Sequence, residues 1–274
     1  MILEFSNLPH PSHPLVYSID GTIHTPLDRF SLVNTQRRDL TTSKSISLCG
    51  IRGRFCDSPR CSNCSPYKSK QFLARVLHTY KKSSTQSAAL LTLTIANSAV
   101  GELAKGYAEL TGLLSESFTK RSWLTGKAGI TGYARAIELT YNTEINSWNL
   151  HAHILITGDD AQKSSDKILT RWQFKAAEMN INVHASAQDS RNIPVKDIPK
   201  TLAYIFKQHA LYESRNSSSL SPGNLLRLAA HGDMEFVDLI HEYETASKGV
   251  HTRTSGGILK ASTVAALKAS APDA

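Results

Sequence analysis

The hydrophobic and polar positions change along the chain from an irregular arm to regular helical and strand-like patterns. Residues 1–44 are polar, rich in Pro, Ser and Thr, and show no periodicity, so we expect a flexible arm. Residues 67–82 have helical spacing, in which Phe72, Val76 and Leu77 form one apolar edge and basic side chains occupy most of the rest. This pattern predicts a basic helix.

In the next part of the chain, segments with the helical spacing of apolar residues alternate with segments that have the pattern of strands. The predicted elements are a strand at 88–96, a helix at 99–119, strands at 133–141 and 148–157, a helix at 161–178, a strand at 181–187 and a helix at 195–211. This order is typical of a ferredoxin-like split βαβ arrangement, so the expected fold class is α+β with an antiparallel sheet.

The segment after Ser214 has a different composition. Helical patterns near 222–230 and 233–247 predict a helical C-terminal extension over residues 215–261. Residues 262–274 are rich in Ala and Ser, and we expect them to be disordered.

Two histidines occupy the second strand of a predicted β-hairpin. The link Asn142–Ser147 is short and polar, which indicates that the strands on either side of it pair. Because side chains alternate along a strand, His151 and His153 lie on one face and Ala152 on the other. Two imidazoles on one face can share a divalent ion. A satisfied polar face without a metal fits the same pattern.

The register of this hairpin brings in a carboxylate. A turn centred between Glu144 and Ile145 places Glu138 opposite His151, and a shift of two residues places it opposite His153. Glu138 therefore shares the histidine face in either register. Two histidines and one carboxylate would leave positions open for water or a phosphate oxygen, so we predict Glu138 as a third metal ligand. The first register also pairs Tyr141 with Trp148 on the opposite face.

The last predicted helix of this region carries a tyrosine and a lysine. Tyr204 and Lys207 are three residues apart and share a face, whereas Leu202, Ile205 and Phe206 would anchor the helix to the sheet. Two explanations are open for the polar pair. It is either a surface tyrosine beside a charge, or an oxygen nucleophile with a cation that steadies the phenolate and a phosphate.

All four cysteines lie in one short segment. They are Cys49, Cys56, Cys61 and Cys64. Four clustered thiolates suit a structural tetrahedral zinc site, and the alternative is a set of free thiols in a loop. Basic residues that could contact phosphate surround the cluster or follow it on the basic helix, and the candidates for DNA binding are Arg52, Arg54, Lys68 and Arg75.

The overall charge agrees with a polyanionic partner. Lys and Arg exceed Asp and Glu by 31 to 23, giving a net charge of +8 and a pI near 9.3, which fits nucleic-acid binding or an ordinary basic protein. No apolar run approaches the ~20 residues that span a bilayer, and the N-terminus has no signal-peptide apolar region. We therefore expect a cytoplasmic protein with no membrane partner.

Six segments, in chain order, resemble the rolling-circle replication initiators (Rep proteins) of small plasmids, which belong to the HUH endonuclease superfamily. The segments are LCGIRGRFCDSPRCSNC at 48–64, LLTLTIAN at 90–97, YARAIELTYN at 133–142, WNLHAHILI at 148–156, LAYIFKQ at 202–208 and EYETASKG at 242–249. The resemblance covers roughly residues 46–260. It implies an HUH nuclease core at 83–214, preceded by a zinc segment and basic helix at 45–82.

The resemblance also implies roles for individual residues. His151, His153 and Glu138 would hold Mg²⁺ or Mn²⁺, Tyr204 would be the nucleophile and Lys207 its helper. Some single-tyrosine members have a Glu one turn before the Tyr that activates water at termination. This chain has Lys200 there, and Asp197 is a candidate substitute on the same face.

The implied activity is site-specific nicking and rejoining of single-stranded or hairpin plasmid origin DNA through a 5′-phosphotyrosine intermediate. The freed 3′-OH would prime synthesis by a host polymerase, and a host helicase would take part. One alternative is an HUH transposase or relaxase with the same chemistry. The other is a zinc-containing regulator without catalysis, which would bind duplex DNA through the cysteines and the helix at 67–82.

Overall fold

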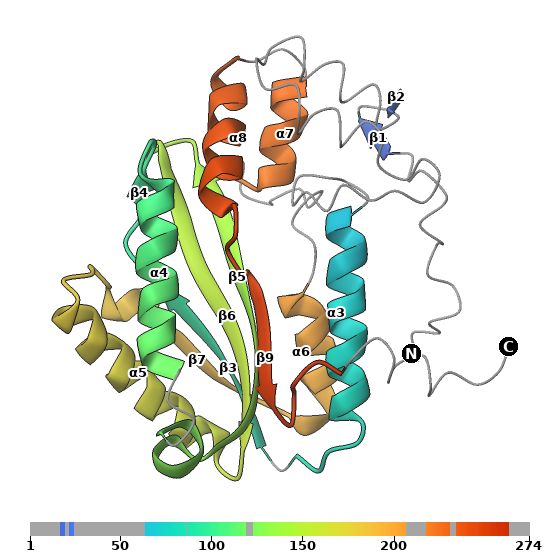
Figure 1. Ribbon diagram of the computed structural model, residues 1–274, viewed down its shortest axis with the longest axis vertical. Helices are drawn as coiled ribbons and strands as arrows, with labels where there is room; N and C mark the ends of the chain where they lie inside the picture. The colour runs from blue at the N-terminus through green and yellow to red at the C-terminus, as the bar shows by residue number, and fades with distance from the viewer. Residues whose placement is uncertain are drawn as a thin grey trace, which may run out of the picture.

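The computed structural model of the protein describes residues 17–19, 22–24, 64–85, 87–118, 123–206, 218–230 and 234–262. They form a mixed α+β structure around a curled antiparallel sheet (Figure 1). The strands are β1 (Tyr17–Ile19), β2 (Thr22–His24), β3 (Ser87–Thr94), β4 (Ser98–Ala99), β5 (Ile130–Asn142), β6 (Ser147–Gly158), β7 (Asp189–Ile193), β8 (Ser219–Leu220) and β9 (Arg253–Gly257). The helices are α3 (Cys64–Tyr80), α4 (Leu103–Phe118), α5 (Ala161–Glu178), α6 (Ile198–Ile205), α7 (Pro222–Ala230) and α8 (Met234–Ser247).

The main sheet has the topology expected from the sequence. Its strand order is β7-β3-β6-β5-β8, with β4 added to β6 and β9 added to β5. In chain order the core runs β3-α4-β5-β6-α5-β7, and β6 lies between β3 and β5. This insertion of one strand into a βαβ unit is the predicted split βαβ arrangement.

One predicted strand is wrong. Residues 181–187 were expected to be a strand, but residues 185–187 form a 3-10 turn and the strand β7 follows at Asp189–Ile193. The sequence DSRNI has no apolar alternation, and it becomes a strand because it pairs with residues 88–92 of β3 at the sheet edge. Ile181 is buried and packs into the core without strand pairing.

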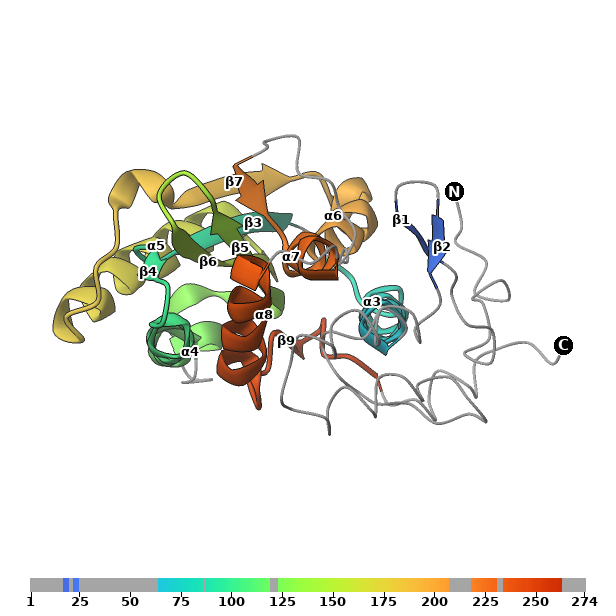
Figure 2. The same ribbon diagram turned by 90° about the horizontal axis from the view of Figure 1, so that it is seen from above.

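Helices cover both faces of the sheet (Figures 1 and 2). One face packs on α4 and α5, where Leu150, Ala152, Ile154 and Ile156 of β6 join the larger core cluster, as their alternation predicted. The other face packs on α3 and α6 through a second cluster that includes Leu155 of β6. The odd-numbered residues of β6 therefore face α6, which decides where the two histidines point.

The C-terminal segment is part of the same structure. The pattern of residues 215–261 predicted helices, and α7 and α8 confirm them, but β9 was not predicted and pairs with β5 along residues 132–136. Glu242 of α8 accepts hydrogen bonds from the amides of Gly101 and Leu103 at the start of α4 and from the indole Nε1 of Trp148 on β6, each at 2.9 Å. The segment thus ties α4 to the hairpin.

Short elements complete the described chain. β1 and β2 pair with each other in the N-terminal arm, where the pattern predicts no element. A π-helical turn at Trp123–Ala128 leads into β5, and 3-10 turns occur at Ala185–Ala187 and Val195–Asp197. Within the described residues, none of the helices combines the length and apolar character needed to cross a bilayer.

Candidate functional site

The site begins with the turn that fixes the β5–β6 register. The side-chain oxygen of Asn142 accepts from the amides of Glu144 at 2.9 Å and Ile145 at 3.3 Å, which closes the tight turn. Asn146 has a φ of 48°, a left-handed conformation that Asn adopts more readily than most residues, and it accepts a hydrogen bond from the Tyr141 hydroxyl. The predicted register is confirmed, since residue 138 pairs with 151 and residue 141 with 148.

This register brings the three predicted ligands together. The Nε2 atoms of both histidines point to one oxygen of Glu138, at 3.3 Å from His151 and 3.0 Å from His153. The two imidazole rings meet edge to face, with centroids 4.9 Å apart. The three side chains are only 10–16% exposed, so the carboxylate and imidazoles converge in a largely dry environment.

The three side chains fit a divalent cation. One ligand atom from each residue can be chosen so that all three lie within 4.8 Å of one another. Two imidazole nitrogens and a carboxylate oxygen are ordinary ligands for divalent metals, and three protein ligands leave coordination positions open. A buried carboxylate also needs positive charge nearby, which a bound cation supplies. The predicted Glu138–His151–His153 group therefore fits a divalent metal ion by geometry and by donor chemistry.

The structure places Tyr204 beside this group. Tyr204 lies on α6, and its ring contacts the His153 ring at a centroid distance of 5.6 Å in an edge-to-face arrangement. Leu202 and Ile205 on the same helix are buried against the sheet, as predicted, whereas Tyr204 is 44% exposed. A partly exposed phenol thus lies beside the Glu138–His151–His153 group near the C-terminal end of α6.

Helix α3 holds α6 at both ends. At the C-terminal end of α6, the Ser69 hydroxyl donates to the carbonyl of Phe206 at 2.6 Å, and the Phe72 ring packs edge-on against the Phe206 ring at 5.0 Å. Just before α6 begins, the Tyr80 hydroxyl donates to the carbonyl of Val195 at 3.2 Å. The apolar edge predicted for the basic helix therefore supports the helix that carries Tyr204.

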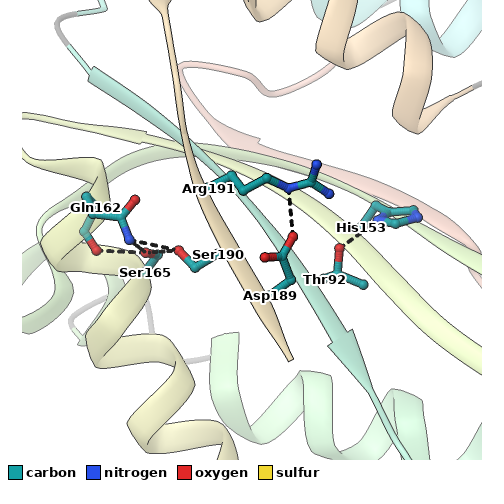
Figure 3. A network of polar contacts seen from close by, with 7 residues as sticks. All are labelled: Thr92, His153, Gln162, Ser165, Asp189, Ser190 and Arg191. Carbon is teal, nitrogen blue, oxygen red and sulfur yellow. Dashed lines mark hydrogen bonds and ion pairs between the residues drawn. The ribbon is translucent and has the colours of Figure 1, made fainter. Parts of the chain in front are cut away.

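Thr92 on β3 is a site residue that the sequence analysis did not single out. Its hydroxyl lies 3.1 Å from Nδ1 of His153, the ring nitrogen on the side away from Glu138 (Figure 3). Thr92 pairs with His153 across the β3–β6 ladder. Thr92 lies in a buried strand and in the family-like segment LLTLTIAN at 90–97, but neither signal gave it a role, because the register between β3 and β6 depends on tertiary pairing.

Charged side chains on neighbouring strands extend the site face. Figure 3 shows Asp189 and Arg191 of β7 turned to the same side as Thr92, whereas Ser190 turns to α5. Nε of Arg191 donates to Asp189 at 2.7 Å, and both side chains are substantially exposed. The Arg191 guanidinium thus adds a positive charge, paired with Asp189, to the sheet face that carries Thr92 and His153.

A half-buried arginine of β9 lies along the outer edge of the hairpin and interacts electrostatically with Tyr243. Arg253 of β9 pairs with Ala136, which in turn pairs with His153. Burial lowers the pKa of Arg253, and the Tyr243 phenol opposes this shift. Burial, reinforced by Glu244, raises the pKa of Tyr243 to about 12, so at neutral pH the phenol is neutral and the guanidinium keeps its charge.

Several predicted site residues lie outside the described residues. These are Lys207, Arg52, Arg54, Cys49, Cys56 and Cys61, and their roles remain predictions. Cys64 is the first residue of α3. Arg75 lies on α3, and its Nε donates to the carbonyl of Ser262, so this guanidinium also fastens the C-terminal segment. Lys68 is half-buried on the same helix, and its DNA contact likewise remains a prediction.

The comparison with family models gave one match. The model described as Rep_1, replication protein, matches residues 50–268, which is well over half of the chain. Neither the search of curated proteins nor the search of solved structures gave a significant match.

Proposed function

Because the chain belongs to the Rep_1 family of replication proteins, which indicates a plasmid replication initiator that binds origin DNA, we propose that it nicks and rejoins single-stranded origin DNA through Tyr204. The observation that carries the proposal is the contact between the Tyr204 and His153 rings beside the Glu138–His151–His153 group. An exposed phenol next to three convergent metal-type ligands suits phosphoryl transfer better than a purely DNA-binding role.

The chemistry is a transesterification. The Tyr204 oxygen attacks the scissile phosphorus, the bond from phosphorus to the 3′ oxygen breaks, and the 5′ phosphate stays joined to Tyr204. The phenol proton leaves as the new bond forms, and the departing 3′ oxygen takes up a proton to become a 3′-OH. Since the phosphodiester energy is kept in the phosphotyrosine bond, the same 3′-OH can later attack and restore the strand without ATP.

The residues of the site divide this work. Glu138, His151 and His153 would hold Mg²⁺ or Mn²⁺, which when bound would withdraw charge from a phosphate oxygen in the transition state. The His153 ring also packs against Tyr204 and so fixes the phenol relative to that phosphate. We propose that Lys207 steadies the phenolate, as the family resemblance implies.

The site face also determines the form of the DNA. The triad is 10–16% exposed and the sheet face around it is covered by α3 and α6, so a base-paired, stacked phosphate could not enter. A single strand, extruded from a hairpin or otherwise unpaired, can present one phosphate to Tyr204. We propose that the elements from β3 to α6 form the HUH nuclease core.

The test uses single-stranded oligonucleotides that tile both strands of the replicon carrying the gene, labelled at the 3′ end. The full-length protein is incubated with each oligonucleotide and Mn²⁺, and the products are separated on a denaturing gel. We expect one oligonucleotide to yield a labelled protein–DNA adduct that EDTA prevents.

Two matched variants decide the assignment. Tyr204→Phe should bind the same oligonucleotide with unchanged affinity but give no adduct. Tyr212 is the next tyrosine in the chain, eight residues further on, and because we expect one nucleophile, Tyr212→Phe should give the adduct at the wild-type level. Nicking by Tyr204→Phe would show that the nucleophile is elsewhere. Binding by the wild-type protein with no adduct on any oligonucleotide would favour a non-catalytic DNA-binding role.

A further inference from the structure

The Thr92 hydroxyl contacts Nδ1 of His153, the ring nitrogen that does not point to Glu138. His153 Nε2 lies 3.0 Å from the Glu138 carboxylate, and its Nδ1 lies 3.1 Å from the Thr92 hydroxyl. The edge-to-face contact with Tyr204 is a third constraint on the same ring. From these contacts we propose that Thr92 is a positioning residue, which orients His153 both for metal binding and as the support for Tyr204. The inference rests on the proposed metal role of the triad.

The backbone around Thr92 is suited to this task. Thr92 lies in β3 between two paired strands, opposite His153 on β6 and opposite Asp189 on β7. A hydroxyl attached to a strand held on both sides has little freedom, because the sheet fixes its Cα and a β-branched side chain has few rotamers. The hydrogen bond can therefore hold the imidazole plane at one angle.

A hydroxyl also suits both states of the site. When Nε2 donates to Glu138 in the metal-free protein, Nδ1 has a lone pair and Thr92 can donate to it. When Nε2 is a metal ligand, the neutral ring carries its proton on Nδ1, and Thr92 can accept from it. The ring carries one proton in both states, on Nε2 without metal and on Nδ1 with metal, so the imidazole gains and loses no proton overall. Valine has the same shape as threonine but can neither donate nor accept.

The chain offers a matched control two residues away. Thr94 lies on the same strand and face, opposite His151, and is also half-buried. Its hydroxyl makes no hydrogen bond with His151 among the described contacts; its backbone amide and carbonyl instead bond with the Gln188 side chain. Thr92→Val and Thr94→Val are therefore the same chemical change at equivalent places, with and without an imidazole partner.

The test measures Mn²⁺ affinity of the full-length protein by titration calorimetry, without DNA. We expect Thr92→Val to weaken Mn²⁺ binding by roughly 10–100-fold, the usual effect of losing an outer-shell partner. Thr94→Val should bind Mn²⁺ like the wild type, and Thr92→Ser, which keeps the hydroxyl, should bind within about threefold of the wild type. His153→Ala should lose the site.

The outcomes separate this inference from the proposed function. Wild-type affinity in Thr92→Val with loss in His153→Ala would overturn the role of Thr92 and leave the triad as the metal site. Equal weakening in Thr92→Val and Thr94→Val would show a packing effect and overturn it too. Unchanged Mn²⁺ binding in His153→Ala would overturn both proposals.

A spectroscopic measurement on the wild-type protein keeps the inference testable if Thr92→Val does not fold. Long-range ¹H–¹⁵N spectra distinguish a ring proton on Nε2 from one on Nδ1. We expect the His153 proton on Nε2 in the metal-free protein and on Nδ1 after saturation with Mg²⁺. A His153 proton that stays on Nε2 in the Mg²⁺ form would overturn both proposals. A proton on Nδ1 that exchanges with solvent as fast as an exposed ring proton would overturn the role of Thr92 and leave the triad as the metal site.

Discussion

The hairpin β5–β6 and the helix α6 bring their residues to the same place by different means. The hairpin is two long strands, held in register by its own turn and packed on helices through a core that includes the fully buried Trp148. Helix α6 has eight residues, too few to be stable alone, and it depends on contacts with the sheet and with α3. The three proposed metal ligands are thus positioned locally, and Tyr204 is positioned by tertiary packing.

This difference predicts which substitutions should change metal affinity and which should change adduct formation. A weakened hairpin should reduce metal affinity and adduct formation together, because it carries all three ligands. A weakened support of α6 should reduce adduct formation and leave metal affinity intact, because Tyr204 is not a proposed ligand. The substitutions that follow show whether metal affinity and adduct formation change together or separately.

The largest effect is expected from Trp148→Ala in the hairpin. Trp148 is fully buried, lies 5.1 Å from the Tyr141 ring, and donates through its indole to Glu242. Its truncation should lower the free energy of unfolding by about 3–5 kcal/mol in urea titrations and weaken Mn²⁺ binding. Trp148→Phe, which keeps an aromatic ring, should lower the free energy of unfolding by less. Unchanged Mn²⁺ affinity in Trp148→Ala would mean that the hairpin does not position its ligands as one unit.

The next effect concerns the metal itself. Mn²⁺ at a hundred times its dissociation constant should raise the free energy of unfolding by about 2.7 kcal/mol, since it binds only the folded chain, and EDTA should reverse this. The stabilisation should vanish in His153→Ala. Thermal unfolding with and without Mn²⁺ measures it, and an equal gain in His153→Ala would place the metal elsewhere.

Phe72→Ala should separate the two regions. Phe72 is half-buried against Phe206. We therefore expect the substitution to lower the free energy of unfolding by about 2 kcal/mol, less than for a fully buried phenylalanine. The rate of adduct formation should fall about tenfold or more while Mn²⁺ affinity stays at the wild-type value. Phe174→Ala is the matched control, because Phe174 is 59% exposed on α5 and should change neither quantity.

The smallest effect is expected from Ser69→Ala. The Ser69 hydroxyl is buried and its removal deprives the Phe206 carbonyl of a partner, which should cost about 1 kcal/mol. The adduct rate should fall by a few-fold with Mn²⁺ affinity unchanged. Ser164→Ala removes an equally buried hydroxyl on α5 that donates to the Ala128 carbonyl at 2.6 Å, away from α6, and should leave the adduct rate unchanged. Equal effects of the two variants would count against a specific support of α6.

The sequence alone determined the central hairpin and the face that its histidines and Glu138 share. The alternation around His151 and His153 decided which side chains share a face, and both registers that the short polar turn allowed placed Glu138 on that face. The structure has the register in which Glu138 lies opposite His151. The helical periods of α3, α4, α5, α7 and α8 were likewise visible, because each buries one apolar stripe. These features depend on residues close together in the chain.

The tertiary structure decided the rest. β7 and β9 have few apolar residues, and they are strands only because β3 and β5 offer them partners. The hydrogen bond from Thr92 to His153 joins residues 61 positions apart, and the support of α6 by Ser69 joins residues 137 positions apart. No local pattern encodes such distances, because they depend on how whole elements pack. The face shared by Glu138, His151 and His153 could be derived by counting along one hairpin, whereas the position of Tyr204 on that face required the fold.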